Sequence, residues 1–256
     1  DIISSEDIEG VIVATPPATH FHIAKAAIKA GKPVLIEKPV TMDVQQAEDL
    51  LKLSRRMDVP VLVDHIHLFS AAYNELKAAL GEIGTITKII SSGGNYGPVR
   101  PDTPMIWDWA PHDLSMCLDI MDCEPEIIHA ELLASEQIEG GIGRHIGMQV
   151  TFPGGVIGHI EISNITRQKS RRFEVIGDQG SLIYDDLAKD KLCMIDRSGK
   201  AFPIQLSESS PVTNLINSFS KMIIDGNHQP KTLEQGVVIV RLLTEVIAVS
   251  KGTLAD

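Results

Sequence analysis

The sequence predicts an α/β fold joined to an α+β fold: a partial parallel sheet, followed by a large, mostly antiparallel open sheet with flanking helices. The first observation is a series of three short apolar runs, separated by two helical stretches, before residue 65. The second is a series of alternating apolar and polar segments after residue 84, separated by turn residues. We therefore divide the chain into residues 1–64 and residues 65–256.

The first part alternates between strands and helices. Apolar runs at Val11–Thr15, Val34–Ile36 and Val61–Val63 suit strands that are buried on both faces of a parallel sheet. Between them, Ala18–Ala30 and Asp43–Met57 have the apolar spacing of helices. This order of elements predicts a right-handed parallel βαβαβ unit.

The second part is predicted to hold a series of strands between helices. Tyr73–Leu80 is a short helix, another helix follows Pro111, and Val212–Asp225 and Thr232–Lys251 are helices near the end. Turn sequences rich in Gly, Pro and Asp separate the strands. The predicted strands are Thr85–Ser92, Ile127–Ala134, His145–Phe152, Val156–Ser163, Arg171–Ile176, Ser181–Asp185, Leu192–Asp196 and Phe202–Leu206.

Composition and charge predict a globular protein of the cytoplasm. The chain has 256 residues, 43% of them hydrophobic, which is enough for one large or two ordinary domains. Its net charge of −11 argues against binding to nucleic acid or to anionic membranes. The longest uncharged stretch near the start, Val11–Ala24, is too short to span a bilayer. Cys117, Cys123 and Cys193 lack metal-ligand spacing, so we expect reduced thiols.

Two pairs of histidines have the spacing of residues on one strand face, His65 with His67 and His20 with His22. A zinc site needs three or four protein ligands, and the spacing suggests no third ligand for either pair. We therefore predict no metal site.

Residues 31–39, Gly-Lys-Pro-Val-Leu-Ile-Glu-Lys-Pro, hold the first group of chemically active residues. Charges at the carboxyl end of a parallel strand lie where open α/β sheets bind ligands. Lys38 would then lie at the edge of a crevice, poised for proton transfer or anion binding, with Pro39 ending the strand. The alternative is a solvated pair of charges, Glu37 and Lys38, at the strand end.

A long connection rich in Gly and Pro, predicted at Ser91–Asp108, holds the second group. Loops of more than about 12–15 residues inside a compact domain are usually functional or disordered. This loop carries residues suited to recognition, namely Asn95, Tyr96, Arg100 and Trp107.

The helix that follows this loop carries a histidine near its predicted start. Pro111 suits the first turn, which would place His112 and Asp113 at the positive end of the helix dipole. Because that end disfavours a positive charge, His112 should be neutral near pH 7 and able to accept a proton. A purely structural histidine is the alternative.

These motifs resemble those of one family of oxidoreductases. Ala-Thr-Pro at residues 14–16, His20 and the Gly-Lys-x-Val-Leu-x-Glu-Lys-Pro motif are similar to the second half of the Rossmann domain in the glucose–fructose oxidoreductase / inositol dehydrogenase / MocA-like (Gfo/Idh/MocA) family. The resemblance implies a partial dinucleotide-binding Rossmann domain in residues 1–64 and a domain for substrate and oligomer contacts in residues 65–256. It continues in the family's order at Gly81–Gly84, Trp107, Asp108, His112, Phe173–Gly177 and Gly180–Leu182.

The resemblance implies hydride transfer between NAD or NADP and a hydroxyl or carbonyl group of a sugar, nucleotide sugar or cyclitol. In that family an Asp and a His four residues apart face the nicotinamide beside the motif lysine, which implies catalytic roles for Lys38, Asp108 and His112. Our hypothesis is that His112 takes the proton, oriented by Asp108, while Lys38 hydrogen-bonds the reacting oxygen; Lys38 is the alternative base.

Further site residues are implied by the same resemblance. A position on the helix surface is the alternative for His20. The implied cofactor-binding residues are Ala14, Thr15, Pro16, His20, Glu37 and Lys38, and the substrate-binding residues are Asn95, Tyr96, Arg100 and Trp107.

One departure from the family pattern concerns the start of the chain. Family members begin with a strand, a glycine-rich turn and a helix that hold the pyrophosphate, and this sequence starts after them. We therefore expect a fragment of a longer protein. Two functional classes stay open: an NAD(P)-dependent oxidoreductase, or a truncated non-catalytic protein that acts as a self-associating sheet module. For the enzyme, the resemblance implies a homo-oligomer formed through the antiparallel sheet.

Overall fold

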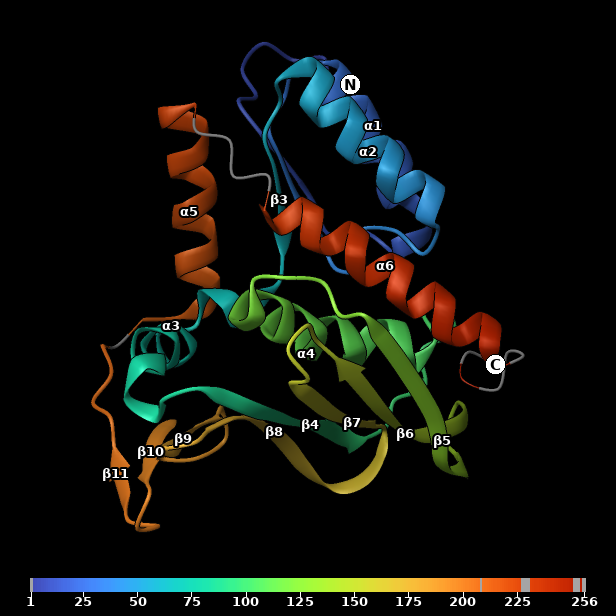
Figure 1. Cartoon of the computed structure of the whole chain (residues 1–256). Helices are drawn as coiled ribbons and strands as arrows, with labels where there is room; N and C mark the ends of the chain where they lie inside the picture. The colour runs from blue at the N-terminus through green and yellow to red at the C-terminus, as the bar shows by residue number, and fades with distance from the viewer. Residues whose placement is uncertain (1, 208, 227–230, 251–253, 255–256) are drawn as a thin grey trace.

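The computed structural model describes residues 2–207, 209–226, 231–250 and 254. A three-stranded sheet with its helices lies above an eight-stranded sheet, and helix α4 (Met105–Met121) lies between the two (Figure 1). The α/β plus α+β architecture predicted from the sequence is confirmed.

The small sheet is parallel, in the order β1-β2-β3, as predicted. Helix α2 begins where Asp43 accepts a hydrogen bond from the backbone N–H of Gln46 at 2.8 Å, which satisfies one free donor of the first turn. The elements are β1 (Val11–Val13), α1 (Pro17–Lys29), β2 (Val34–Glu37), α2 (Val44–Met57) and β3 (Val61–Asp64).

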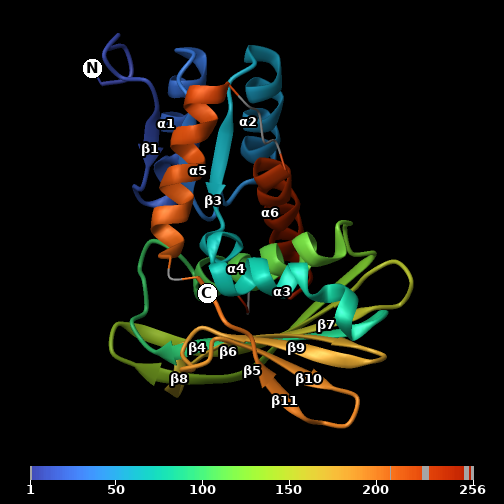
Figure 2. The ribbon, with the colours of Figure 1, turned by 90° about the vertical axis from the view of Figure 1, so that its left-hand side faces the viewer.

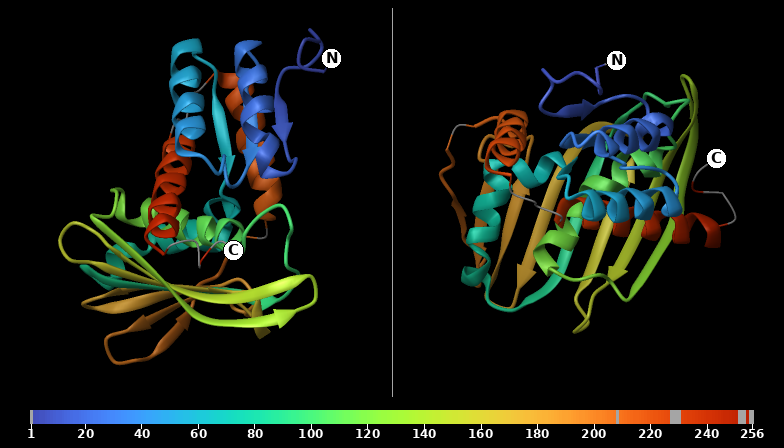
Figure 3. Two further views of the ribbon diagram at one scale, coloured as in Figure 1. Left: turned by 90° about the vertical axis from the view of Figure 1, so that its right-hand side faces the viewer. Right: turned by 90° about the horizontal axis from the view of Figure 1, so that it is seen from above.

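Helices from the end of the chain cover this parallel sheet on both faces. Leu35 and Leu62 on one face pack against α5 (Pro211–Asp225). On the other face, α6 (Lys231–Val249) packs against α2 and β3, in addition to the cover that α1 provides. Figures 2 and 3 show α5 and α6 on opposite sides of β3. Burial on both faces explains why these strands are apolar at consecutive positions.

The large sheet has the strand order β11-β10-β9-β8-β4-β7-β6-β5. Among the described strands of this large sheet, β4 and β7 are parallel neighbours, and the other neighbouring pairs are antiparallel. The helices lie on one face of this sheet, and no helix of the described residues lies on the other face (Figures 2 and 3). The strands are β4 (Ile86–Tyr96), β5 (Ile127–Ile138), β6 (Gly141–Thr151), β7 (Ile157–Ser163), β8 (Ile165–Gly177), β9 (Gly180–Asp185), β10 (Leu192–Asp196) and β11 (Ala201–Pro203).

Short helices join the two sheets. A 3₁₀ turn at Ile66–Phe69 leads from β3 into α3 (Ala71–Ala78), and a second 3₁₀ turn at Leu80–Ile83 leads into β4. The helix predicted at Tyr73–Leu80 is therefore present but begins two residues earlier. The helix predicted to end at Lys251 corresponds to α6, and residue 251 lies outside the described residues.

The predicted long loop at Ser91–Asp108 is wrong, because β4 extends to Tyr96 and α4 begins at Met105. Two of the three glycines of this segment, Gly93 and Gly94, lie within the strand. A Cβ atom on Gly94 would stand 2.9 Å from the backbone oxygen of Ser163, so the parallel neighbour β7 approaches too closely for a side chain. The connection is consequently reduced to residues 97–104.

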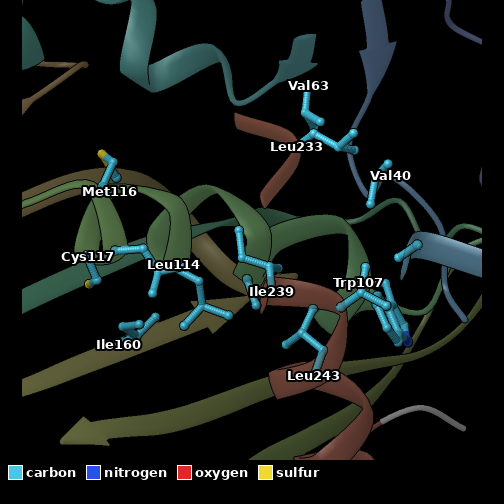
Figure 4. Close-up of a cluster of buried hydrophobic side chains, with 14 of the residues drawn as sticks. Val40, Val63, Trp107, Leu114, Met116, Cys117, Ile160, Leu233, Ile239 and Leu243 are labelled. Carbon is cyan, nitrogen blue, oxygen red and sulfur yellow. The ribbon is translucent and has the colours of Figure 1, made fainter. Parts of the chain in front are cut away.

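The main core lies where α4 is enclosed by the large sheet and α6. Leu114 and Cys117 of α4 and Ile160 of β7 are buried in one cluster with Ile239 and Leu243 of α6 (Figure 4). Within the described part of the chain, no helix is long and apolar enough to cross a membrane.

Candidate active site

A cavity of about 250 Å³ opens at the carboxyl edge of the parallel sheet. Strand ends of this kind converge in open α/β folds, which makes this edge the usual ligand position. The walls come from the segments after β1 and β2 and from the segment that leads into α4. The lining residues are Ala14, Thr15, Pro17, His20, Glu37, Lys38, Pro39, Arg100, Thr103 and Asp108.

Lys38 and Asp108 form an ion pair at the centre of this cavity wall. The Lys38 ammonium lies 2.7 Å from Asp108 Oδ1 and also donates to the Asp108 backbone oxygen. The two side chains are 12% and 25% exposed, so the pair is largely shielded from solvent. Arg100 approaches the same carboxylate oxygen at 3.5 Å. Asp108 therefore holds two cations, and one N–H of Lys38 remains for a ligand.

His20 fixes the ends of two parallel strands. Its fully buried ring lies between the backbone oxygens of Thr15, 2.7 Å from Nε2, and Pro39, 2.9 Å from Nδ1. The alternative position on the helix surface is therefore wrong. The ring connects the segment after β1 with the segment that carries Lys38.

His112 lies in the interior of α4 and not at its start. The helix begins at Met105 and continues through Pro111, so the predicted effect of the helix end does not apply. Burial, followed by the positive charge of Lys38, lowers the pKa of His112 well below its usual value. The predicted neutral state is thus confirmed, with a different physical cause.

The surroundings of His112 also correct the predicted role of Asp108. The His112 ring meets that of His67 edge to face, with 5.2 Å between centroids, and His112 Nδ1 is buried without a hydrogen-bond partner among the described residues. Asp108 pairs with Lys38 and Arg100 and makes no hydrogen bond to His112 in the described structure. The carboxylate therefore orients Lys38.

A second acidic group borders the same strand ends. Glu37 and Asp64 are register partners on β2 and β3, and Asp64 Oδ1 is buried without a hydrogen-bond partner in the part of the chain that is described. Burial, together with the nearby carboxylate of Glu37, raises the pKa of Asp64 to about 7. The carboxyl group of Asp64 is thus poised to change its charge near neutral pH.

A second cavity, of about 210 Å³, shares Arg100, Thr103 and Asp108 with the first. It lies between the connection to α4 and the inner face of the large sheet. Its remaining walls are Pro98, Val99, Pro101, Pro104, Met105, Trp109, Ile142, Arg144 and Asn164. The shared residues place the two cavities side by side.

Arg144 on β6 and Asn164 after β7 line the second cavity but were not predicted from the sequence. A signal was present for Arg144. Every second residue from Arg144 to Val150 faces inward, and the other members of this series, Ile146, Met148 and Val150, are apolar and buried. An arginine within an apolar, inward-facing series is an exception that could have marked a polar site.

Of the four residues predicted for substrate binding, only Arg100 borders the two cavities. Trp107 is 6% exposed and packs in the core, while its neighbour Trp109 lines the second cavity. Asn95 and Tyr96 lie in β4, outside both cavity walls, and Tyr96 is 49% exposed. The physical reason is that a helix and a strand occupy most of the predicted loop.

Histidine pairs do not form a metal site in the described part of the chain, where no group of three His, Cys, Asp or Glu side chains is arranged to hold an ion. His65 and His67 are both buried. Burial, followed by Lys38 for His65 and Arg171 for His67, lowers the pKa of each to about 4. Both rings are thus neutral, buried groups near α4.

Two family models match the chain. One, described as an oxidoreductase family with an NAD-binding Rossmann fold, matches residues 1–65, and the other, the GFO/IDH/MocA C-terminal domain, matches residues 75–183. The crystal structure of a putative oxidoreductase from Magnetospirillum magnetotacticum MS-1 is similar over 95% of this chain and 81% of its own, with 37% identity and a TM-score of 0.90.

Curated relatives include enzymes with assigned substrates. UDP-N-acetylglucosamine 3-dehydrogenase from Acidithiobacillus ferrooxidans is 26% identical over 66% of this chain. Myo-inositol 2-dehydrogenase from Thermotoga maritima is 26% identical over 78% of this chain. The matched region spans 53% and 63% of these two relatives, respectively.

Proposed function

The chain belongs to the GFO/IDH/MocA family of oxidoreductases, and on that premise we propose that it transfers a hydride between a nicotinamide cofactor and a hydroxyl or carbonyl group of a sugar-like substrate. The observation that carries the proposal is the Lys38–Asp108 ion pair in the cavity at the carboxyl edge of the parallel sheet. Sugars, nucleotide sugars and cyclitols are the proposed substrate class, because relatives act on UDP-N-acetylglucosamine, 1,5-anhydro-D-fructose and myo-inositol by name.

The lining of the first cavity supports the proposal that NAD or NADP binds there. Five of the six proposed cofactor contacts line it: Ala14, Thr15, His20, Glu37 and Lys38. Small side chains and backbone on the β1 side leave room for a flat ring, and His20 holds the two strand ends at a fixed separation. When bound, the nicotinamide supplies the hydride acceptor or donor.

Residues of this chain are proposed to accept the proton that the substrate hydroxyl group releases. Oxidation of a hydroxyl group releases a proton as the hydride leaves, so a base and a stabilising donor are both needed. Lys38 can donate its remaining N–H to the reacting oxygen while Asp108 holds the ammonium group in place. His112, which is neutral, is the proposed base.

Titration with NAD(H) and NADP(H), followed by nicotinamide fluorescence, tests the cofactor assignment. Binding in the micromolar range, followed by turnover of a sugar, nucleotide sugar or cyclitol in a substrate screen, is the expected result. The tighter cofactor identifies the physiological one. Absence of binding for either cofactor at millimolar concentration would refute the proposal.

We also propose that the uncovered face of the large sheet joins two copies of the protein. Apolar side chains on that face are exposed on the edge strand β5, with Ile127 at 61% and Leu133 at 45%. Exposed apolar clusters commonly mark association surfaces. Sedimentation at several concentrations should show a dimer or larger assembly that Leu133→Lys weakens; a monomer at all concentrations would exclude this arrangement.

A further inference from the structure

Arg144 is a buried cation that has no ion-pair partner among the described residues. It is 9% exposed, and its side chain lines the second cavity from the inner face of β6. None of the described acidic side chains forms an ion pair with its guanidinium group. Buried charges in proteins are ordinarily paired, because removing an ion from water is costly.

The backbone of Arg144 is held firmly in place. Asn164 Oδ1 accepts a hydrogen bond from the Arg144 backbone N–H at 2.6 Å, and the Asn164 N–H donates to the Arg144 backbone oxygen at 3.0 Å. Both residues border the second cavity. The guanidinium group is therefore supported by a fixed main chain.

The other cations that line the two cavities, Lys38 and Arg100, are already paired. Lys38 is paired with Asp108, and Arg100 is paired with Asp102 at 3.2 Å and also approaches Asp108 at 3.5 Å. Two carboxylates thus balance these two cations. The positive charge of Arg144 is left over in a chain whose net charge is −11, so this cavity is locally positive in an acidic protein.

We propose that the second cavity binds an anionic substituent of the substrate, a carboxylate or a phosphate group, through the Arg144 guanidinium. The planar guanidinium group matches the geometry of either anion. This inference rests on the proposed function, because it narrows the substrate class to sugar-like molecules that carry such a group. The reacting carbon would then face Lys38 in the adjoining cavity while the anion anchors the other end.

Intrinsic fluorescence can report this binding without turnover. The chain contains two tryptophans, Trp107 and Trp109, and Trp109 lines the second cavity. We would titrate the protein, with and without saturating NAD⁺, with glucose, glucuronate and glucose 6-phosphate. Glucuronate and the phosphate ester separate the two possible anions, and glucose is the neutral reference.

The expected result is that at least one charged ligand binds about tenfold or more tightly than glucose, and that Arg144→Gln removes this preference. Arg144→Lys, which keeps the charge but loses the planar fork, should retain part of it. Arg167→Gln, at an exposed arginine of β8, is the matched control and should leave the preference unchanged.

Equal binding of glucose and both charged ligands by the parent protein would overturn the inference, as would an unchanged preference in folded Arg144→Gln. If Arg144→Gln fails to fold, two other measurements test the inference: the preference of Arg144→Lys for charged ligands, and the salt dependence of that preference in the parent protein. The inference is overturned if the preference changes neither in Arg144→Lys nor with salt. Fluorescence records binding and not turnover. A failure of the anion site would therefore not refute the proposed hydride transfer, which a neutral sugar could still undergo.

Discussion

The Lys38 ammonium lies 2.7 Å from Asp108 Oδ1, although the two residues are 70 positions apart in the chain. The contact joins the carboxyl end of a parallel strand to the first turn of the helix that crosses the large sheet. Both side chains line the first cavity and are largely shielded from solvent. Replacing either residue therefore leaves the other without its ion-pair partner in the cavity wall. The first prediction follows from this contact.

Lys38→Met should lower kcat by about 100-fold or more, because it removes the hydrogen-bond donor to the reacting oxygen. Asp108→Asn should cause a smaller loss, about tenfold, since Lys38 stays but is less firmly held. Steady-state rates of nicotinamide reduction measure both effects. Lys52→Met, at an exposed lysine of α2, is the control; activity of Lys38→Met within a few-fold of the parent would exclude the assigned role.

The pKa of His112 should rise when Lys38 is neutralised. Burial and then the charge of Lys38 lower the pKa of His112, so its protonation begins below the usual value of about 6.5. In Lys38→Met one cause is removed, and the His112 ring should titrate at higher pH in an NMR pH series. His112→Gln identifies the resonance. An identical titration in parent and Lys38→Met would show that the two groups are not coupled.

His112→Gln should also reduce kcat by about 100-fold if His112 is the base. The pKa of His112 is lowered, so the ring stays neutral at pH values below the usual histidine pKa. In the parent protein, kcat/KM should therefore decrease only when the pH falls below that usual pKa and His112 becomes protonated. The pH dependence of kcat/KM for the parent and for His112→Gln measures this. Turnover of His112→Gln close to that of the parent would leave Lys38 as the base.

Asp64→Asn should stabilise the protein at pH above 7. The pKa of Asp64 is raised to about 7 by burial and by Glu37, so the folded state binds more protons than the unfolded state between about pH 4 and pH 7. Stability contributed by the protonated carboxyl is therefore lost as the pH rises through this window. An uncharged amide avoids that loss, which is on the order of 4 kcal/mol for the raised pKa of Asp64.

Chemical denaturation of parent and Asp64→Asn at pH 5 and pH 8 measures this difference. The variant should gain stability relative to the parent at the higher pH. Asp190→Asn, at an exposed aspartate, serves as the control and should show no such pH dependence. A stability difference for Asp64→Asn that is the same at both pH values would contradict the prediction.

Gly94→Ala should destabilise the large sheet by about 1–3 kcal/mol, because the added methyl group would stand 2.9 Å from the Ser163 backbone oxygen. The strain falls on the junction of the parallel strands β4 and β7. Gly81→Ala is the matched control, since nothing lies within 4 Å of a Cβ atom there. Equal midpoints of unfolding for both variants would refute the close approach of the two strands.

Several features of the fold could be predicted from the sequence alone. Apolar runs such as Val34–Ile36 identify strands buried on both faces, and their order with the two helices determines the parallel unit. Lys38 could be placed at the ligand-binding edge because it directly follows one of these strands. These predictions succeed because periodicity and burial are properties of neighbouring residues.

Only the tertiary structure decided which distant segments meet. Gly93 and Gly94 indicate a loop by composition, yet they form a strand because β7 lies close beside them. Asp108 pairs with Lys38 and not with His112, and Arg144 lines the second cavity, because α4 is placed between the two sheets. A local pattern determines how a segment folds and which face it buries, whereas the partner of a charge depends on packing between elements far apart in the chain.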